Sequence, residues 1–244
     1  MEGVVRRRPP EEGESYFMSM TDMMVGLLLI FIILLVYFAL NLQTETEKLT
    51  GADNARAQML EDLQQSLKDR GLQVQIDTTT GVLRLPDDVL FDKGRWELSG
   101  PGRTAVGKVA AALVEELPCY TTSPLCPDGQ RKEHLIDAMF VEGHTDTDAM
   151  AGGMNNYELS VRRAETTFSM LQRLQPRLAS FRNGTAGRSG SAPILSLSGY
   201  GPDRPVDARA TEAAKRKNRR IDLRFLMQTP DAGLDADILR KDGR

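Results

Sequence analysis

Residues 18–42 read MSMTDMMVGLLLIFIILLVYFALNL, and no residue from Met23 to Leu42 is charged. At about 1.5 Å of rise per residue, a helix of this length spans roughly 30 Å, the thickness of a bilayer's hydrocarbon core. A buried core helix this long would carry a polar face. A cleaved signal peptide would have a shorter apolar run and a small-residue cleavage site. The stretch therefore predicts one uncleaved membrane-spanning helix, residues 15–42.

The charges that flank this span predict its orientation. Arg6, Arg7 and Arg8 precede the span, whereas the segment that follows it carries only Lys48 close by. Lysine and arginine favour the cytoplasmic side of a membrane. We therefore expect residues 1–14 to be a cytoplasmic tail of a single-pass inner-membrane protein, with the C-terminal part in the periplasm.

Asp22 is the one ionisable residue at the start of the apolar run. In a helix, Ser15, Ser19, Asp22 and Gly26 share one face, because they are three or four residues apart. A small polar stripe in lipid usually faces another helix or a water-filled path, and an aspartate there is a candidate functional group. The alternative is that Asp22 only reaches back to the cytoplasmic headgroups.

Composition narrows the possible functions of the rest of the chain. The chain has 244 residues and a net charge of −3, which gives no reason to expect a nucleic-acid partner. We find no nucleophile–base set, phosphate-binding loop or metal cluster in the sequence, so we expect neither an enzyme nor a cofactor or metal site. The two cysteines, Cys119 and Cys126, lie in a proline-rich loop and are predicted to form a disulfide in an oxidising compartment.

Beyond the span, the hydrophobic pattern predicts an α+β fold with a mixed sheet covered by helices. Residues 43–70 are polar and helix-forming, and they are either a weakly self-associating linker helix or a solvated spacer. The domain is expected over residues 71–228 and a mobile tail over 229–244. Its expected strands lie near residues 72–76, 82–85, 135–141, 194–198 and 221–227, and its expected helices near 99–117, 156–174 and 208–217.

Four motifs of this domain, in order along the chain, resemble the OmpA-like peptidoglycan-binding family. They are Val89-Leu90-Phe91-Asp92 as an early strand, Val141-Glu142-Gly143-His144-Thr145-Asp146, the N-x-x-L-S-x-x-R-A pattern from Asn156 to Ala164, and Gly199-Tyr200-Gly201 followed by Asn218-Arg219-Arg220-Ile221. The resemblance implies that Asp146 and Arg163 bind the amine and the carboxylate of a cell-wall stem peptide, because a fixed anion and a planar guanidinium complement a zwitterion. Thr145, Asn156 and Arg219 are expected to border that site, although Arg219 lies where it would equally well close a helix. A structural ion pair between Arg163 and Asp146 is the alternative, and His144 is expected to be structural.

The combination of a single span with an aspartate, a linker and an OmpA-like domain resembles the MotB-like stator family. The segment Thr21-Asp22-Met23-Met24 is most similar to the ZorB branch of that family, from the Zorya anti-phage systems. The resemblance implies a homodimer inside a ring of a larger MotA-like membrane subunit (ZorA in Zorya). It also implies that Asp22 carries the translocated ion, with Ser19 and Thr21 beside it; we favour protons over sodium. The alternatives are a flagellar stator subunit and a passive tether between membrane and cell wall.

Overall fold

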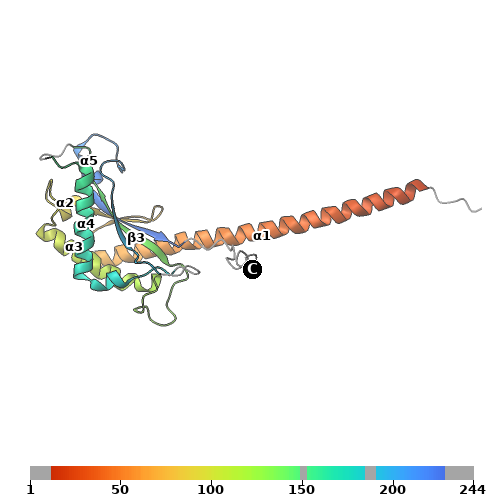
Figure 1. Cartoon of the computed structure of the whole chain (residues 1–244), viewed down its shortest axis with the longest axis horizontal. Helices are drawn as coiled ribbons and strands as arrows, with labels where there is room; N and C mark the ends of the chain where they lie inside the picture. The colour runs from red at the N-terminus through yellow and green to blue at the C-terminus, as the bar shows by residue number, and fades with distance from the viewer. Residues whose placement is uncertain (1–11, 149–152, 185–190, 229–244) are drawn as a thin grey trace, which may run out of the picture. The chain divides into compact units, whose positions relative to one another are not determined.

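The computed structural model describes residues 12–148, 153–184 and 191–228, and only the backbone of residues 12–19 and 44–49. Most of the expected N-terminal tail (1–14) and the whole expected C-terminal tail (229–244) therefore lie outside the described residues. The chain forms two compact units, Met1–Lys48 and Leu49–Arg244. The first helix, α1 (Glu12–Asp69), contributes to both units (Figure 1).

The first unit contains the apolar stretch. Among the described residues, one helical segment, Met20–Gln43, is long and apolar enough to cross a membrane. Every side chain in it is exposed, including large ones such as Leu27, Phe31 and Phe38. A continuous exposed apolar surface of this kind is stable in lipid and unfavourable in water.

The second half of α1 belongs to the folded domain. Met59, Leu60, Leu63 and Leu67 recur at helical spacing and are fully buried in the main hydrophobic core. Earlier in the same part of α1, Arg56 donates a hydrogen bond from Nη2 to the carbonyl oxygen of Thr79, at 3.1 Å. The expectation of a solvated spacer is therefore wrong for this part of residues 43–70, because its leucines fill the domain's interior.

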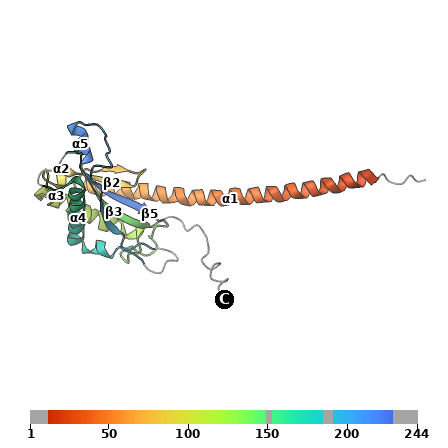
Figure 2. The same ribbon diagram turned by 45° about the horizontal axis from the view of Figure 1, so that its top comes forward.

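The domain is built on a five-stranded mixed sheet with the order β1-β2-β5-β3-β4. Its strands are β1 (Gln75–Asp77), β2 (Val82–Pro86), β3 (Ile136–His144), β4 (Leu195–Gly199) and β5 (Arg220–Met227). β3 and β4 are parallel, and the other neighbouring pairs are antiparallel. Figure 2 shows β2, β5 and β3 within this sheet. The expected α+β class with a mixed sheet is confirmed.

Two long helices cover the sheet, and each begins with a side-chain cap. In α3 (Gly100–Glu116), Ser99 accepts a hydrogen bond from the Gly102 amide, and in α4 (Asn156–Leu174), Asn155 accepts one from the Glu158 amide. α4 packs on β3 and β4, and α3 packs on α4. The shorter helices are α2 (Asp87–Leu90), α5 (Glu212–Asn218) and the 3₁₀ turns η1 (Pro118–Tyr120) and η2 (Pro176–Ser180).

The segment Val89-Leu90-Phe91-Asp92 differs from the expected strand. Its first two residues end the short helix α2, and Phe91 forms only an isolated bridge with Leu98. Leu90 and Phe91 are nevertheless buried in the core. An apolar run this short has the same burial in a helix turn as in a strand, so the pattern alone did not distinguish them.

The glycine at the end of β3 allows α4 to approach the sheet closely. A Cβ placed on Gly143 would lie 2.0 Å from the carbonyl oxygen of Ser160, which is backbone and cannot move aside. Gly143 pairs with Gly199 of β4, where a Cβ would also meet the start of α4. Two glycines on adjacent parallel strands thus set the distance between sheet and helix beside the candidate site.

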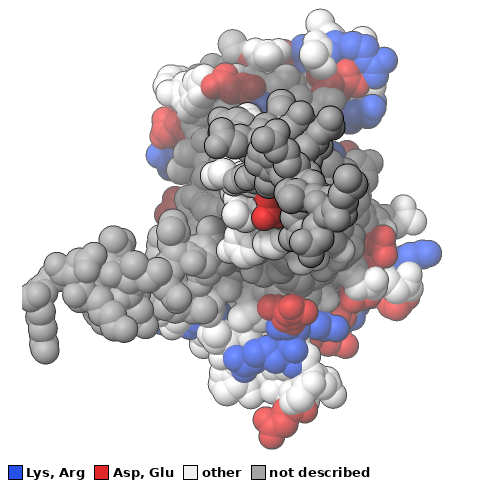
Figure 3. Space-filling view, turned by 90° about the vertical axis from the view of Figure 1, so that its right-hand side faces the viewer, with Lys and Arg blue, Asp and Glu red and all other residues white. Residues whose placement is uncertain are grey.

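Charged side chains of both signs share the domain's surface. On the face shown in Figure 3, acidic and basic residues are interspersed among the described residues. The chain as a whole has a net charge of −3, from 31 basic and 34 acidic residues. Electrostatic recognition at any one site must come from its local charges, because mixed signs largely cancel at a distance.

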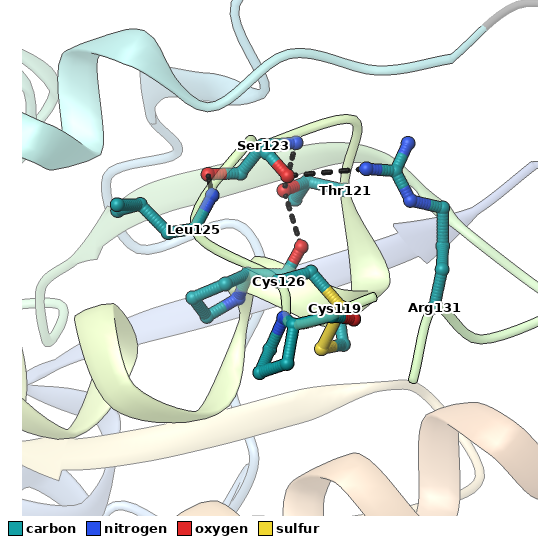
Figure 4. The surroundings of a disulfide bond; sticks show 8 residues. Cys119, Thr121, Ser123, Leu125, Cys126 and Arg131 are labelled. Atoms are coloured by element: carbon teal, nitrogen blue, oxygen red, sulfur yellow. Dashed lines mark hydrogen bonds between the residues drawn. A yellow bond between two sulfur atoms is a disulfide. The ribbon is translucent and has the colours of Figure 1, made fainter. Parts of the chain in front are cut away.

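The predicted disulfide between Cys119 and Cys126 is present (Figure 4). It closes a short loop whose turns are held by side chains: Thr121 Oγ1 donates to the Pro118 carbonyl at 3.0 Å, and Arg131 Nη2 donates to the Ser123 carbonyl at 3.1 Å. Thr121 and Ser123 are both buried. The loop is thus an ordered part of the domain, cross-linked at its base.

Candidate functional site

The candidate site starts where β3 ends. Thr145 and Asp146 follow His144 directly, and the Thr145 amide donates to the carbonyl of Gly201 at 3.0 Å. Thr145 is buried and its hydroxyl has no partner among the described residues. Asp146 is 7% exposed, and its Oδ1 accepts a hydrogen bond from the Asp148 amide at 3.1 Å. The aspartate is therefore fixed at the carboxyl end of the parallel strand pair.

Asp146 forms an ion pair with Arg219, at the end of α5. The contact joins Arg219 Nη1 to Asp146 Oδ2, and the arginine side chain keeps 23% of its surface exposed. Sequence reasoning left open whether Arg219 borders the site or closes the helix, and its geometry does both. Its amide donates to the Lys215 carbonyl as the cap of α5, while its guanidinium lies on Asp146.

Arg163 lies deeper than Asp146 and has a different partner. It is 1% exposed, and its Nη1 lies 3.0 Å from Asp87 Oδ1. Its Nε donates to the carbonyl oxygen of Arg95 at 2.8 Å, and the guanidinium sits 5.1 Å from the centre of the Phe91 ring. Of the two alternatives for Arg163, the structural ion pair is present, but with Asp87 in place of Asp146.

Asp87 is the site residue that the sequence analysis missed. It begins α2 directly after Pro86 and is 4% exposed. Burial raises its pKa to about 6, although the facing guanidinium of Arg163 opposes the shift. Burial likewise lowers the pKa of Arg163. The only signal in the sequence was an acidic pair after a proline, which is also a common way to begin a surface helix.

The four charges interact as one cluster. The electrostatic neighbours of Asp87 include Arg163, Arg219 and Asp146, and those of Arg163 include the same Arg219 and Asp146. Two carboxylates and two guanidiniums thus balance each other within the domain. The pair formed by Asp146 and Arg219 is nearer the surface, and the pair formed by Asp87 and Arg163 is inside.

Asn156 and Lys215 tie the loop after β3 to two helices. Asn156, the first residue of α4, donates from Nδ2 to the Asp148 carbonyl at 2.9 Å. Lys215 of α5 binds the Asp148 carboxylate at 2.6 Å. Asn156 therefore contacts the backbone of the loop that carries Asp146, and its place in a binding site stays a prediction.

Behind the site, Glu142, His144 and Asp222 form a buried triad. His144 Nε2 lies 3.8 Å from Glu142 Oε2 and 3.6 Å from Asp222 Oδ2, and the imidazole stacks on Tyr200 at 5.4 Å between ring centres. Three such groups are able to hold a metal ion. Here Arg224 binds Glu142, and Arg84 and Arg220 bind Asp222, at 2.9–3.2 Å. These guanidiniums already supply the positive charge, and burial lowers the pKa of His144 below its usual value.

The predicted ion-translocation residues belong to the other unit of the chain. Asp22 and Thr21 are exposed residues of α1. For Ser15 and Ser19 only the helical backbone is described. Their assignment stays a prediction.

A scan against protein-family models found no match, and neither did a search of curated proteins. Among solved structures, the chain is similar to a putative MotB like protein from Desulfovibrio vulgaris, with a TM-score of 0.50 and 18% identity over 72% of this chain and 95% of that one. The periplasmic domain of Helicobacter pylori MotB gives 0.45 and 20%, over 67% and 83%. The cell wall anchor of the T6SS from Pseudomonas aeruginosa gives 0.45 and 18%, over 70% and 96%. At these identities the likeness concerns the fold, and the fold of this chain is that of the MotB-like protein.

Proposed function

We propose that this chain is a membrane-anchored, peptidoglycan-binding subunit of a MotB-like motor, single-pass in the inner membrane with its N-terminus cytoplasmic. One observation carries the proposal: a single chain joins an apolar helix of membrane-spanning length, with Asp22 at its start, to a domain with a MotB-like fold. Neither part alone distinguishes a motor subunit from other anchored proteins. In their combination, the apolar helix would anchor the chain in the membrane and the domain would bind the cell wall.

The wall-binding chemistry is assigned to the charge cluster. A stem peptide that carries diaminopimelate presents an amine and a carboxylate at one end, and the outer pair offers the complementary groups. The amine replaces Arg219 on Asp146, and the carboxylate is bound by the released guanidinium, so that no charge is left without a partner. Arg163 supports this exchange from behind, and Thr145 and Asn156 hold the loop that carries Asp146.

Binding to purified sacculi tests this assignment. Full-length protein in detergent is sedimented with sacculi, comparing wild type with Asp146→Ala, Arg163→Ala and Arg219→Gln. Asp128→Ala and Arg103→Ala, which change exposed residues elsewhere, serve as controls. We expect the controls to bind like wild type and the site variants to lose binding by about tenfold or more, the effect of losing a charge-assisted hydrogen bond. Because Arg163→Ala leaves Asp87 without its partner, Arg219→Gln is the decisive variant. Wild-type binding by both Asp146→Ala and Arg219→Gln would overturn the assignment.

The motor function is assigned to the apolar helix and its Asp22. We propose that Asp22 accepts and releases a proton next to Ser19 and Thr21, in a homodimer surrounded by a ring of a larger MotA-like subunit. Desolvation disfavours a charged carboxylate, which couples protonation to movement against the ring. The resemblance of Thr21-Asp22-Met23-Met24 favours the Zorya anti-phage type, with ZorB as this subunit and ZorA as the ring, over the flagellar type. The adjacent genes separate the two: nuclease or helicase genes support defence, and chemotaxis genes support locomotion.

A further inference from the structure

A second concave surface lies on α4, next to the charge cluster. It has a volume of about 370 Å³ and runs along the exposed side of the helix. Its lining includes Trp96, Arg162, Glu165, Thr166, Ser169 and Arg173. Nothing in the proposed stem-peptide chemistry uses this surface. Its volume suits a small ligand or one unit of a polymer.

Trp96 is the residue of this groove that most suggests ligand binding. It is the only tryptophan of the chain, and it is only half-buried. The guanidinium of Arg162 lies 4.9 Å from the centre of its ring, and Glu158 holds that guanidinium through contacts of 2.8 and 3.1 Å. The ring is thereby held in place at the surface. A large, fixed aromatic side chain beside hydroxyls and charges is a typical recognition element.

We propose that this groove binds a sugar ring of the glycan strand of peptidoglycan. This inference rests on the proposed function and extends it from the stem peptide to the polymer that carries it. The apolar C–H face of a hexopyranose packs on an aromatic ring, while its hydroxyl and N-acetyl groups need polar partners. Trp96 supplies the ring, and Thr166, Ser169 and Glu165 supply hydrogen-bonding groups along the same helix face.

The position of the groove matches the covalent structure of the ligand. Arg95, whose carbonyl receives the hydrogen bond from Arg163, is the residue before Trp96. On α4, Arg162 of the groove is likewise the neighbour of Arg163. The groove and the buried ion pair of Arg163 are therefore carried by the same two chain segments. In peptidoglycan the stem peptide is attached to a sugar, so a sugar subsite is expected beside a stem-peptide site.

The charge of the groove also suits the muramic-acid unit of the glycan. Arg162 is paired with Glu158, so the charges left to the groove are those of Arg173 and Glu165. Among the described residues, no ion pair is found for Arg173, which is exposed. The muramic-acid unit of the glycan carries a lactyl carboxylate when its peptide is absent and an amide when it is present. Arg173 is suited to bind either oxygen from the side of the helix.

The single tryptophan makes the test direct. Full-length protein in detergent is titrated with peptide-free glycan strands, prepared by amidase digestion of sacculi, and separately with free diaminopimelate-containing stem peptide. Trp96 emission reports on the groove, and calorimetry gives the affinity for both probes. The variants are Trp96→Leu, Trp96→Tyr and Arg173→Gln, with Arg103→Gln as the control on α3.

We expect the glycan strands to change Trp96 emission saturably. Trp96→Leu and Arg173→Gln should weaken strand binding by about tenfold and leave stem-peptide binding within about twofold. Trp96→Tyr, which keeps an aromatic face, should retain most of the affinity, and Arg103→Gln should match wild type. Unchanged emission, or strand binding by Trp96→Leu as tight as that of wild type, overturns the inference.

The two proposals fail separately. Binding of sacculi and stem peptide without any binding of strands refutes the glycan subsite alone. Strand binding that depends on Trp96, in a protein that does not bind the stem peptide, supports the subsite and refutes the assigned role of the charge cluster.

Discussion

Arg163 Nη1 lies 3.0 Å from Asp87 Oδ1, and the two side chains are only 1% and 5% exposed. The pair joins the start of α2 to the middle of α4 inside the domain. Arg163 is the arginine of the N-x-x-L-S-x-x-R-A pattern in α4. The residue expected to bind a ligand is thus also part of a buried structural ion pair. Changes to either residue will therefore affect stability as well as binding.

Asp87→Asn should destabilise the domain by about 3 kcal/mol, because it leaves the guanidinium of Arg163 buried without a counter-charge. Denaturant unfolding of the full chain in detergent, followed by Trp96 emission, measures the change within the domain. Asp88→Asn is the matched control, since Asp88 is the exposed neighbour on the same helix. Equal loss of stability in both variants would show that the pair has no special role.

The pH dependence of stability should depend on His144. Burial lowers its pKa in the folded state, so the unfolded chain binds the proton more readily, and stability should fall as pH decreases through about 6.5. Asp87 acts in the opposite direction: with a folded pKa of about 6, its contribution is present at low pH and is lost as pH rises from about 4 to 6.

Unfolding of wild type and His144→Gln over roughly pH 7.5 to 5.5 separates the two effects. The stability difference between them should narrow as the pH falls, because only wild type has the histidine to protonate. His134→Gln, a change to the only other histidine, is the control. A difference that stays constant across this range would contradict the assignment to His144.

Gly143→Ala should cost about 3 kcal/mol of stability, because the added methyl group would overlap the carbonyl of Ser160 and push α4 from the sheet. Gly100→Ala provides the comparison, since no atom lies within 4 Å of a Cβ at that position, in the first turn of α3. Thermal unfolding of the two variants measures both effects. The prediction is refuted if Gly143→Ala and Gly100→Ala unfold at the same temperature.

Asp22→Asn should keep the chain inserted and assembled while abolishing function, since it preserves the shape of the side chain and removes the titrating group. The measurement is phage protection, or motility for a flagellar protein, after co-expression with the partner subunit and confirmation of assembly. Glu61→Gln, an exposed carboxylate of α1 outside the apolar run, is the control. Full function in the assembled Asp22→Asn protein would favour the passive tether.

Local signals were sufficient for much of the fold. Both ends of α4 were predicted, and its C-terminal end had a local signal because Pro176 prevents the helix from continuing. The five strand regions were also located, since alternation and turn residues act over a few neighbours. The disulfide was predictable for the same reason: its cysteines are seven residues apart in one proline-rich loop.

The rest depended on contacts between distant segments. Asp87 and Arg163 belong to different helices, and nothing in the sequence around either one identifies the other as its partner. The burial of Leu63 and Leu67 likewise depends on the domain against which α1 packs. Residue types at the candidate site were therefore predictable, but their pairing was not, because pairing is a property of the tertiary structure.

The sheet order has a consequence for the synthesis of the protein. β5 is the last strand along the chain, yet it lies in the middle of the sheet, between β2 and β3. Until residues 220–227 have emerged from the ribosome and reached the compartment where the domain folds, β2 and β3 have no strand between them. A prematurely terminated chain that ends before Arg220 would thus retain the apolar helix and its Asp22. It would lack the strand that joins β2 to β3 in the sheet. The sheet that carries the candidate site is therefore complete only in chains whose translation has passed β5.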